Sequence, residues 1–123
     1  MPAPDRLQKI FARVVRFAGV SAKLKIGCKT IDEQRKVPGL SGRRSFMHVG
    51  DVPGAVCAHP AAKKLSDAQL IGLFLHELGH LATGSGDAQA DAWVFTALGI
   101  PIEYRGKLML EWVDPEIIKE KRI

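Results

Sequence analysis

The residues from 76 to 80 read His-Glu-Leu-Gly-His, which is the pattern H-E-x-x-H. On a helix, residues four apart lie one turn from each other on the same face, so His76 and His80 can bind one metal ion together. Zn²⁺ commonly takes imidazole nitrogens as ligands. Glu77 lies beside that face, and its carboxylate can take a proton from a zinc-bound water. The pattern therefore predicts a zinc centre in which Glu77 is the general base of a hydrolytic reaction.

The segment that carries the motif has the features of a buried helix. Ser66 is a good N-cap, and Gln69 stands at the capping-box position three residues later. Apolar residues then continue to about Leu81, and the small residues 83–86 end the helix. Burying two imidazoles and a carboxylate in such a helix costs free energy unless a cation compensates. This favours a metal site over a chance match to the motif.

A catalytic zinc needs a third protein ligand and an open fourth position. Asp87 and Asp91 are four residues apart and share one face of a second helix, predicted over 87–98. If the two helices form a simple hairpin about residues 84–85, Asp91 lies level with the zinc. If the first helix stops just after His80, Asp87 can reach the metal instead. We favour Asp87, and the spacing leaves both alternatives open.

The segment Ser66–Pro101 resembles the gluzincin branch of the zincin metallopeptidases, which carry H-E-x-x-H on one helix and E-x-x-x-D on the next. Its second part is similar to the form E-x-x-A-D with an aromatic residue after it, with Asp in place of Glu. The H-E-x-G-H form and the chain length are similar to those of minigluzincins and ImmA/IrrE-type peptidases. The resemblance implies that Asp87 is the third zinc ligand and that Asp91 orients a ligand histidine. The gap from His80 to Asp87 is shorter than in most gluzincins.

The same resemblance implies a fold and an activity. The fold is a minimal zincin-like α+β domain, with a small twisted sheet, an N-terminal backing helix, the active-site helix and a second ligand-bearing helix. The activity is that of a zinc endopeptidase acting on a specific protein or peptide substrate. The strand predicted over 54–59 is then either the sheet edge that binds extended substrate or an ordinary strand of the sheet. Tyr104 is a candidate for stabilising the oxyanion, and otherwise a half-buried tyrosine of a hairpin.

A second hypothesis is a metal-stabilised, non-catalytic module that binds a protein or nucleic acid for a regulatory purpose. A small domain gains stability from a structural metal. The presence of Glu77 argues against this hypothesis, because a purely structural site does not need that carboxylate. Two further histidines, His48 and His59, are expected to be surface or strand residues and not ligands.

The remaining elements follow from periodicity and turn residues. Apolar residues at helical spacing predict an N-terminal helix over 7–18 that stops at Gly19. Charged residues with Pro38 and two glycines predict a loop over 30–44. The other expected elements are strands over 23–29, 45–49 and 54–59, with a turn between the last two, a hairpin over 102–104 and 108–113, and a short helix from 114.

Length and composition exclude several classes of protein. The chain has 123 residues, of which 46% are hydrophobic and 25% charged, values typical of one globular domain over residues 1–123. They exclude intrinsic disorder, collagen and coiled coil. No apolar run has the roughly 18 residues of a membrane span, and we expect no signal peptide. Cys28 and Cys57 are too few for a disulfide scaffold, so we expect a cytoplasmic protein with reduced thiols.

The charge is distributed unevenly along the chain. The net charge is +5, but residues 1–44 hold eleven basic and three acidic residues, whereas residues 45–100 hold two basic and five acidic ones. The basic excess therefore lies in the first third, away from the predicted metal helices. It is either a solvated surface or a binding surface for nucleic acid or an acidic partner.

Overall fold

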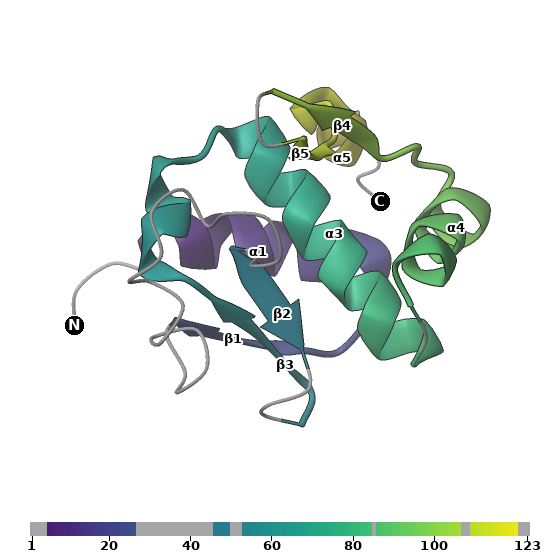
Figure 1. The fold of residues 1–123 in the computed structure, drawn as a ribbon, viewed down its shortest axis with the longest axis horizontal. Helices are drawn as coiled ribbons and strands as arrows, with labels where there is room; N and C mark the ends of the chain where they lie inside the picture. Colours follow the sequence, from purple (N-terminus) through teal and green to yellow (C-terminus); the bar gives the residue numbers. More distant parts are fainter. Residues whose placement is uncertain (1–4, 27–45, 50–52, 85, 107–108, 121–123) are drawn as a thin grey trace.

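The computed structural model describes residues 5–26, 46–49, 53–84, 86–106 and 109–120, with the side chains of 119 and 120 excepted. These residues form a small α+β fold, as the sequence predicts (Figure 1). The helices are α1 (Arg6–Ala18), the 3-10 helix η2 (Pro60–Lys64), α3 (Asp67–Thr83), α4 (Asp87–Leu98) and α5 (Pro115–Glu120). The strands are β1 (Lys23–Ile26), β2 (Met47–Val49), β3 (Ala55–Ala58), β4 (Glu103–Arg105) and β5 (Leu110–Trp112). The predicted loop over 30–44, Cys28 and most of the turn between β2 and β3 lie outside the described residues.

The strands form two separate sheets. In the first, the order is β1-β3-β2, with β1 parallel and β2 antiparallel to β3. In the second, β4 and β5 pair antiparallel, which confirms the predicted hairpin. The expectation that the strand over 54–59 is a sheet edge is wrong, because β3 pairs on both sides. Its four side chains are all buried, as is typical of a central strand without polar alternation. Within the described part of the chain, β2 is the edge nearer α3.

Helix α3 is the centre of the molecule, and its residues are buried at Ala68 and from Leu70 to Gly79. The capping box of Ser66 and Gln69 is formed, with each side chain bonded to the other residue's backbone N–H. One face of α1 packs on α3, and Phe11 meets Phe74 edge to face at 5.1 Å between ring centroids. The buried residues of that α1 face are Leu7, Ile10, Phe11 and Val14. The amphipathic pattern of the N-terminal segment is therefore confirmed as a helix that backs the motif.

Two glycines let other elements approach the backbone of α3 closely. A Cβ at Gly72 would lie 2.7 Å from the backbone nitrogen of Trp112 on β5. A Cβ at Gly79 would lie 2.6 Å from the carbonyl oxygen of Ala90 on α4. Real Cβ atoms do not come so close to backbone, so both approaches require glycine. The contact at Gly79 brings α4 against α3 beside His80.

The polar residues of the junction before α3 have structural roles. Arg6 bonds the Asp67 carboxylate at 2.6 Å and also the carbonyl oxygens of Lys63 and Leu65. Arg6 therefore joins α1 to the start of α3, although it belongs to the basic first third of the sequence. His59 is buried, and its Nδ1 accepts a hydrogen bond from the backbone N–H of the second residue after it. That bond caps η2, so the expectation of a surface or strand residue is wrong for His59, which is buried and follows the end of β3.

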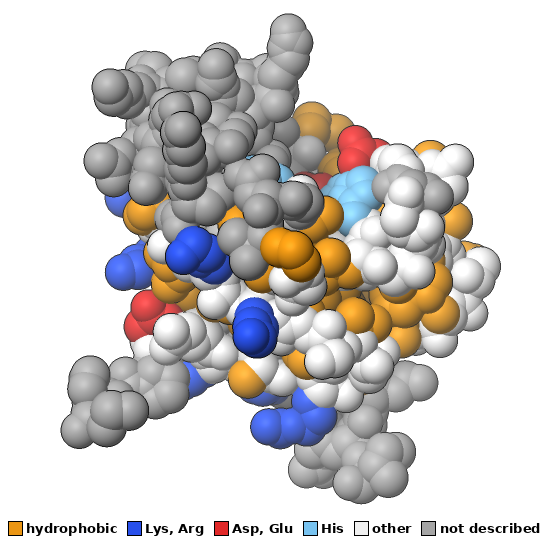
Figure 2. Space-filling model, turned by 90° about the horizontal axis from the view of Figure 1, so that it is seen from below, with side chains coloured by type: hydrophobic (Ala, Val, Ile, Leu, Met, Phe, Trp, Pro, Cys, Tyr) orange, Lys and Arg blue, Asp and Glu red, His pale blue; other side chains and the backbone are white. Residues whose placement is uncertain are grey.

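The charged side chains are unevenly spread over the surface as well as along the sequence. Figure 2, seen from below, shows several separate Lys and Arg side chains with one acidic side chain beside them on the left, and a histidine next to another acidic side chain at the upper right. None of the helices in the described ranges combines the length and the apolarity that crossing a bilayer requires.

Candidate metal centre

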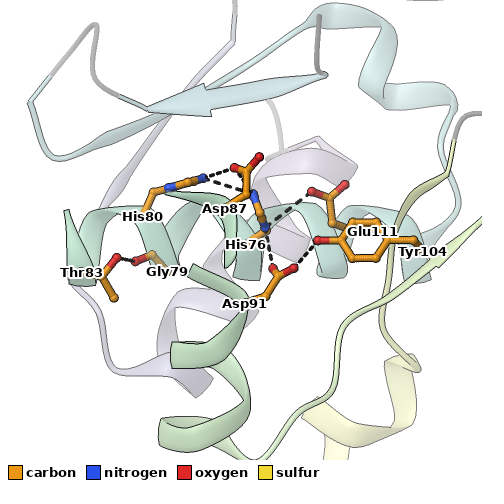
Figure 3. A network of polar contacts seen from close by, with 8 residues as sticks. All are labelled: His76, Gly79, His80, Thr83, Asp87, Asp91, Tyr104 and Glu111. Carbon is orange, nitrogen blue, oxygen red and sulfur yellow. Dashed lines mark hydrogen bonds and ion pairs between the residues drawn. The ribbon is translucent and has the colours of Figure 1, made fainter. Parts of the chain in front are cut away.

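Three donor groups from α3 and α4 converge at one point. The Nε2 atoms of His76 and His80 are 3.1 Å apart, and Oδ1 of Asp87 lies 3.2 Å from the first and 2.9 Å from the second (Figure 3). One ligand atom from each of the three residues lies within 4.8 Å of the others. In the part of the chain that the structure describes, no other residue joins this group.

Asp91 lies on the opposite side of His76 from this convergence point. Its Oδ1 is 2.6 Å from Nδ1 of His76, whereas Asp87 faces Nε2. A carboxylate that accepts Nδ1–H leaves the lone pair of Nε2 directed at a metal. The geometry therefore favours Asp87 as third ligand and Asp91 as the residue that orients His76.

The route by which Asp87 reaches the histidines differs from the one expected from the sequence. Helix α3 does not stop after His80 but continues to Thr83, and Gly84 caps it in the left-handed conformation. Asp87 is the first residue of α4, and α4 begins close to α3 because of the contact at Gly79. Asp87 can therefore be the third ligand even though α3 continues past His80.

The donor set fits a divalent metal such as zinc. Two imidazole nitrogens and one carboxylate oxygen match the ligands of catalytic zinc sites, and three protein ligands leave a fourth position open. His76 is buried, so its nitrogen needs a polar partner. Asp87 has 84% of its side chain exposed, so the point of convergence is open to solvent on that side.

The protonation of the donors reflects the charges gathered around them. Burial lowers the pKa of His76, but the bond to Asp91 and the nearby carboxylates outweigh burial and raise that pKa overall. Burial raises the pKa of Asp87, but the hydrogen bonds and charges of the two histidines together outweigh burial, so that pKa is lowered. The nearby carboxylates thus favour the imidazolium form of His76 in the metal-free protein, and a bound cation would balance the same negative charges.

The hairpin of β4 and β5 closes the site on the Nδ1 side of His76. The hydroxyl of Tyr104 donates a short hydrogen bond to Oδ2 of Asp91 (Figure 3). Burial and this bond raise the pKa of Tyr104. The hydroxyl therefore holds Asp91 in place. The role of Tyr104 as an oxyanion donor stays a prediction.

Glu111 is a site residue that the sequence reasoning missed. Its Oε2 lies 3.6 Å from Nδ1 of His76, and only 14% of its side chain is exposed. Burial, together with the charges of Asp91 and Asp87, raises its pKa, although the Glu111 backbone and His76 oppose this. The available signal was a lone acidic residue between Leu110 and Trp112 in a short apolar strand.

Glu77 is almost fully buried, with 5% of the residue exposed. Burial raises its pKa to about 8, His76 opposes the shift, and Glu111 and Asp87 add to it. In the metal-free protein Glu77 is therefore mostly protonated at neutral pH. A cation held by the neighbouring donors would favour the ionised form, which is the form that acts as a base.

The different positions of the two aspartates predict different losses of zinc affinity. We expect Asp91→Asn to weaken zinc binding by about 10–100-fold, the usual cost of removing a group that orients a ligand. Asp87→Ala removes a ligand atom, so we expect a larger loss. Competition with a chromophoric chelator measures both affinities. Because Asp87 is exposed, its removal should leave the metal-free fold intact by circular dichroism. A larger loss in Asp91→Asn would reverse the assignment.

The chain matches no protein-family model, no curated protein and no solved structure. Residue chemistry and geometry are therefore the basis for any statement about function.

Proposed function

We propose that this protein is a zinc-dependent endopeptidase. The observation that carries the proposal is the convergence of donor atoms from His76, His80 and Asp87 within 4.8 Å, together with the buried carboxyl group of Glu77, which interacts electrostatically with His76 and Asp87. Three ligands and an adjacent general base are the combination that hydrolytic zinc sites require. The two cysteines of the chain, too few for a disulfide scaffold, favour the cytoplasm as its compartment.

The proposed reaction divides the work among named groups. When bound, Zn²⁺ supplies a Lewis acid that polarises the substrate carbonyl and favours deprotonation of water. The carboxylate of Glu77 accepts the proton of the attacking water and then delivers it to the leaving amine. Asp91 holds the ring of His76 through Nδ1, and Tyr104 holds Asp91 through its second oxygen. Tyr104 can stabilise an oxyanion only if its hydroxyl leaves Asp91.

An extended peptide is the substrate form that the fold suits best. Strand β2 lies against α3 and pairs only with β3 among the described strands. Its outer edge can therefore add a strand of substrate by backbone hydrogen bonds. This gives β2 the role that the sequence had suggested for the segment of β3.

The proposal is tested by zinc-dependent cleavage. We expect zinc-loaded protein to cut denatured casein or a mixed peptide library at internal bonds, with the products identified by mass spectrometry. Dialysis against a chelator should abolish the cleavage, and one equivalent of zinc should restore it. The variant His80→Ala, purified and treated identically, controls for a contaminating peptidase.

Two outcomes would contradict an enzyme. One is tight zinc binding that raises the melting temperature while no substrate is cut, which would favour the metal-stabilised, non-catalytic module. The other is cleavage of equal rate in wild type and His80→Ala, which would mean that the activity does not belong to this site.

A further inference from the structure

The first helix and the first strand carry an unusual run of positive charge. Between residues 6 and 26 there are six Lys or Arg and no Asp or Glu. Arg6 is bound to Asp67 and to two carbonyl oxygens of the following junction. The other five side chains belong to exposed residues, and we call them the basic face: Lys9, Arg13, Arg16, Lys23 and Lys25.

The basic face follows from the periods of the two elements. Residues 9, 13 and 16 stand at spacings of four and three, so they share one side of α1. That side is opposite the buried residues that pack on α3. On β1, Lys23 and Lys25 are exposed and alternate with Leu24 and Ile26, which pack against the core. Burial thus fixes the orientation of all five cations.

None of the five cations has an ion-pair or hydrogen-bond partner among the described residues. Charges used for stability are usually paired, as Arg6 is with Asp67. Five unpaired like charges on adjoining elements repel one another and contribute no pairing energy to the fold. A polyanion would supply the missing partners.

The composition of this surface distinguishes between classes of anionic partner. Protein interfaces are anchored by exposed aromatic residues and methionines, and membrane binding needs exposed apolar side chains. The large apolar residues exposed in the described ranges are Phe95, Tyr104 and Met109, none of which is on α1 or β1. Backbone phosphates of nucleic acid, in contrast, need only Lys and Arg.

We propose that the basic face binds the phosphate backbone of nucleic acid without reading its sequence. The basic face belongs to α1 and β1, whereas the three converging donors belong to α3 and α4, so nucleic acid on the basic face uses other elements than the metal centre. The inference does not depend on the proposed peptidase activity, because it uses none of the residues of the metal centre.

The test uses a fluorescein-labelled 20-base-pair DNA duplex and fluorescence anisotropy on the full chain. If five phosphates are neutralised, the logarithm of the affinity falls with that of the salt concentration with a slope of about −4 to −5. Affinity should then drop several hundredfold between 50 and 200 mM salt. Arg13→Gln/Arg16→Gln should make the slope shallower by about 2 and weaken binding at least tenfold at 50 mM salt. A second duplex of unrelated sequence should bind equally well.

A matched variant tests the position of the surface. Lys63→Gln/Lys64→Gln removes the same charge from η2, which lies at the N-terminal end of α1, where Arg6 bonds the carbonyl oxygen of Lys63, and it should leave the slope unchanged. Equal losses in both variants would mean that only net charge matters and would overturn the proposal. It would also be overturned by no binding at 50 mM salt, as for a merely solvated face, or by poly-glutamate binding as tightly as DNA. None of these three results would bear on zinc-dependent cleavage.

Discussion

Glu77→Gln is expected to lower kcat for peptide hydrolysis by about 10²–10⁴-fold while leaving zinc affinity nearly unchanged. The amide has the same shape as the carboxyl group but cannot accept the proton of the attacking water. Because Glu77 is buried beside the ligands and is not one of the converging donors, the metal site should remain. Initial rates with zinc-saturated enzyme and metal content by mass spectrometry measure the two effects separately.

The same substitution should stabilise the metal-free protein, in a manner that depends on pH. Below about pH 4.5, the carboxyl group is protonated in both the folded and the unfolded state. Between about pH 4.5 and pH 8, the carboxyl group loses this proton in the unfolded chain. The buried group of the folded protein, with a pKa of about 8, keeps it. The unfolded state then binds fewer protons, so the stability of the wild type falls as pH rises. Glutamine does not titrate and avoids this loss, which amounts to a few kcal/mol.

Thermal denaturation in the presence of chelator at pH 5, 6.5 and 8 measures how the stabilities of Glu77→Gln and the wild type differ. The melting temperature of Glu77→Gln should exceed that of the wild type by an amount that grows across the series. Glu103→Gln is the matched control, because Glu103 is exposed on β4 and, among the described residues, pairs only with Arg105 at the surface. Equal kcat in Glu77→Gln and wild type would mean that Glu77 is not the general base. If the difference in melting temperature between the two proteins stays the same at all three pH values, the carboxyl group of Glu77 is not held protonated.

The helices of the site were predictable because local signals and burial agree. The capping box at Ser66 and the apolar run after it mark the start and the buried character of α3. The spacing of four residues in each helix then places His76 beside His80, and Asp87 one turn before Asp91, whatever the rest of the fold does. Each of these predictions uses the geometry of a single helix and no contact between elements.

Contacts between elements were not predictable in the same way. Whether β3 is an edge or a central strand depends on which strands pair with it, and a run of small apolar residues fits either position. Glu111 reaches His76 only because β5 packs on Gly72, and these residues are far apart in the sequence. The choice between Asp87 and Asp91 likewise depended on where α4 crosses α3.

That crossing depends on a single residue, and Gly79→Ala is expected to disturb it strongly. The added Cβ would lie 2.6 Å from the carbonyl oxygen of Ala90 and 3.0 Å from its Cα. Backbone atoms cannot rotate away as a side chain can, so α4 as a whole must move. In an open helix, alanine would instead gain about 1 kcal/mol over glycine. A clash of this kind costs about 1–3 kcal/mol, so we expect a net loss of stability.

The loss of zinc affinity should be larger than the loss of stability suggests, since Asp87 and Asp91 both move with α4. We expect zinc binding at least tenfold weaker, measured by chelator competition, together with a lower melting temperature.

Gly86→Ala is the control on the same connection, because its Cβ would meet only the flexible side chain of Gln89, at 3.4 Å. Because Gly86 is the N-cap of α4, where alanine is less favourable than glycine, it should cost up to about 1 kcal/mol of stability but leave zinc affinity intact. If Gly79→Ala melts at or above the wild type and binds zinc equally well, α4 does not depend on this contact. Helix propensity would then outweigh the clash, and another feature would have to hold Asp87 beside the two histidines.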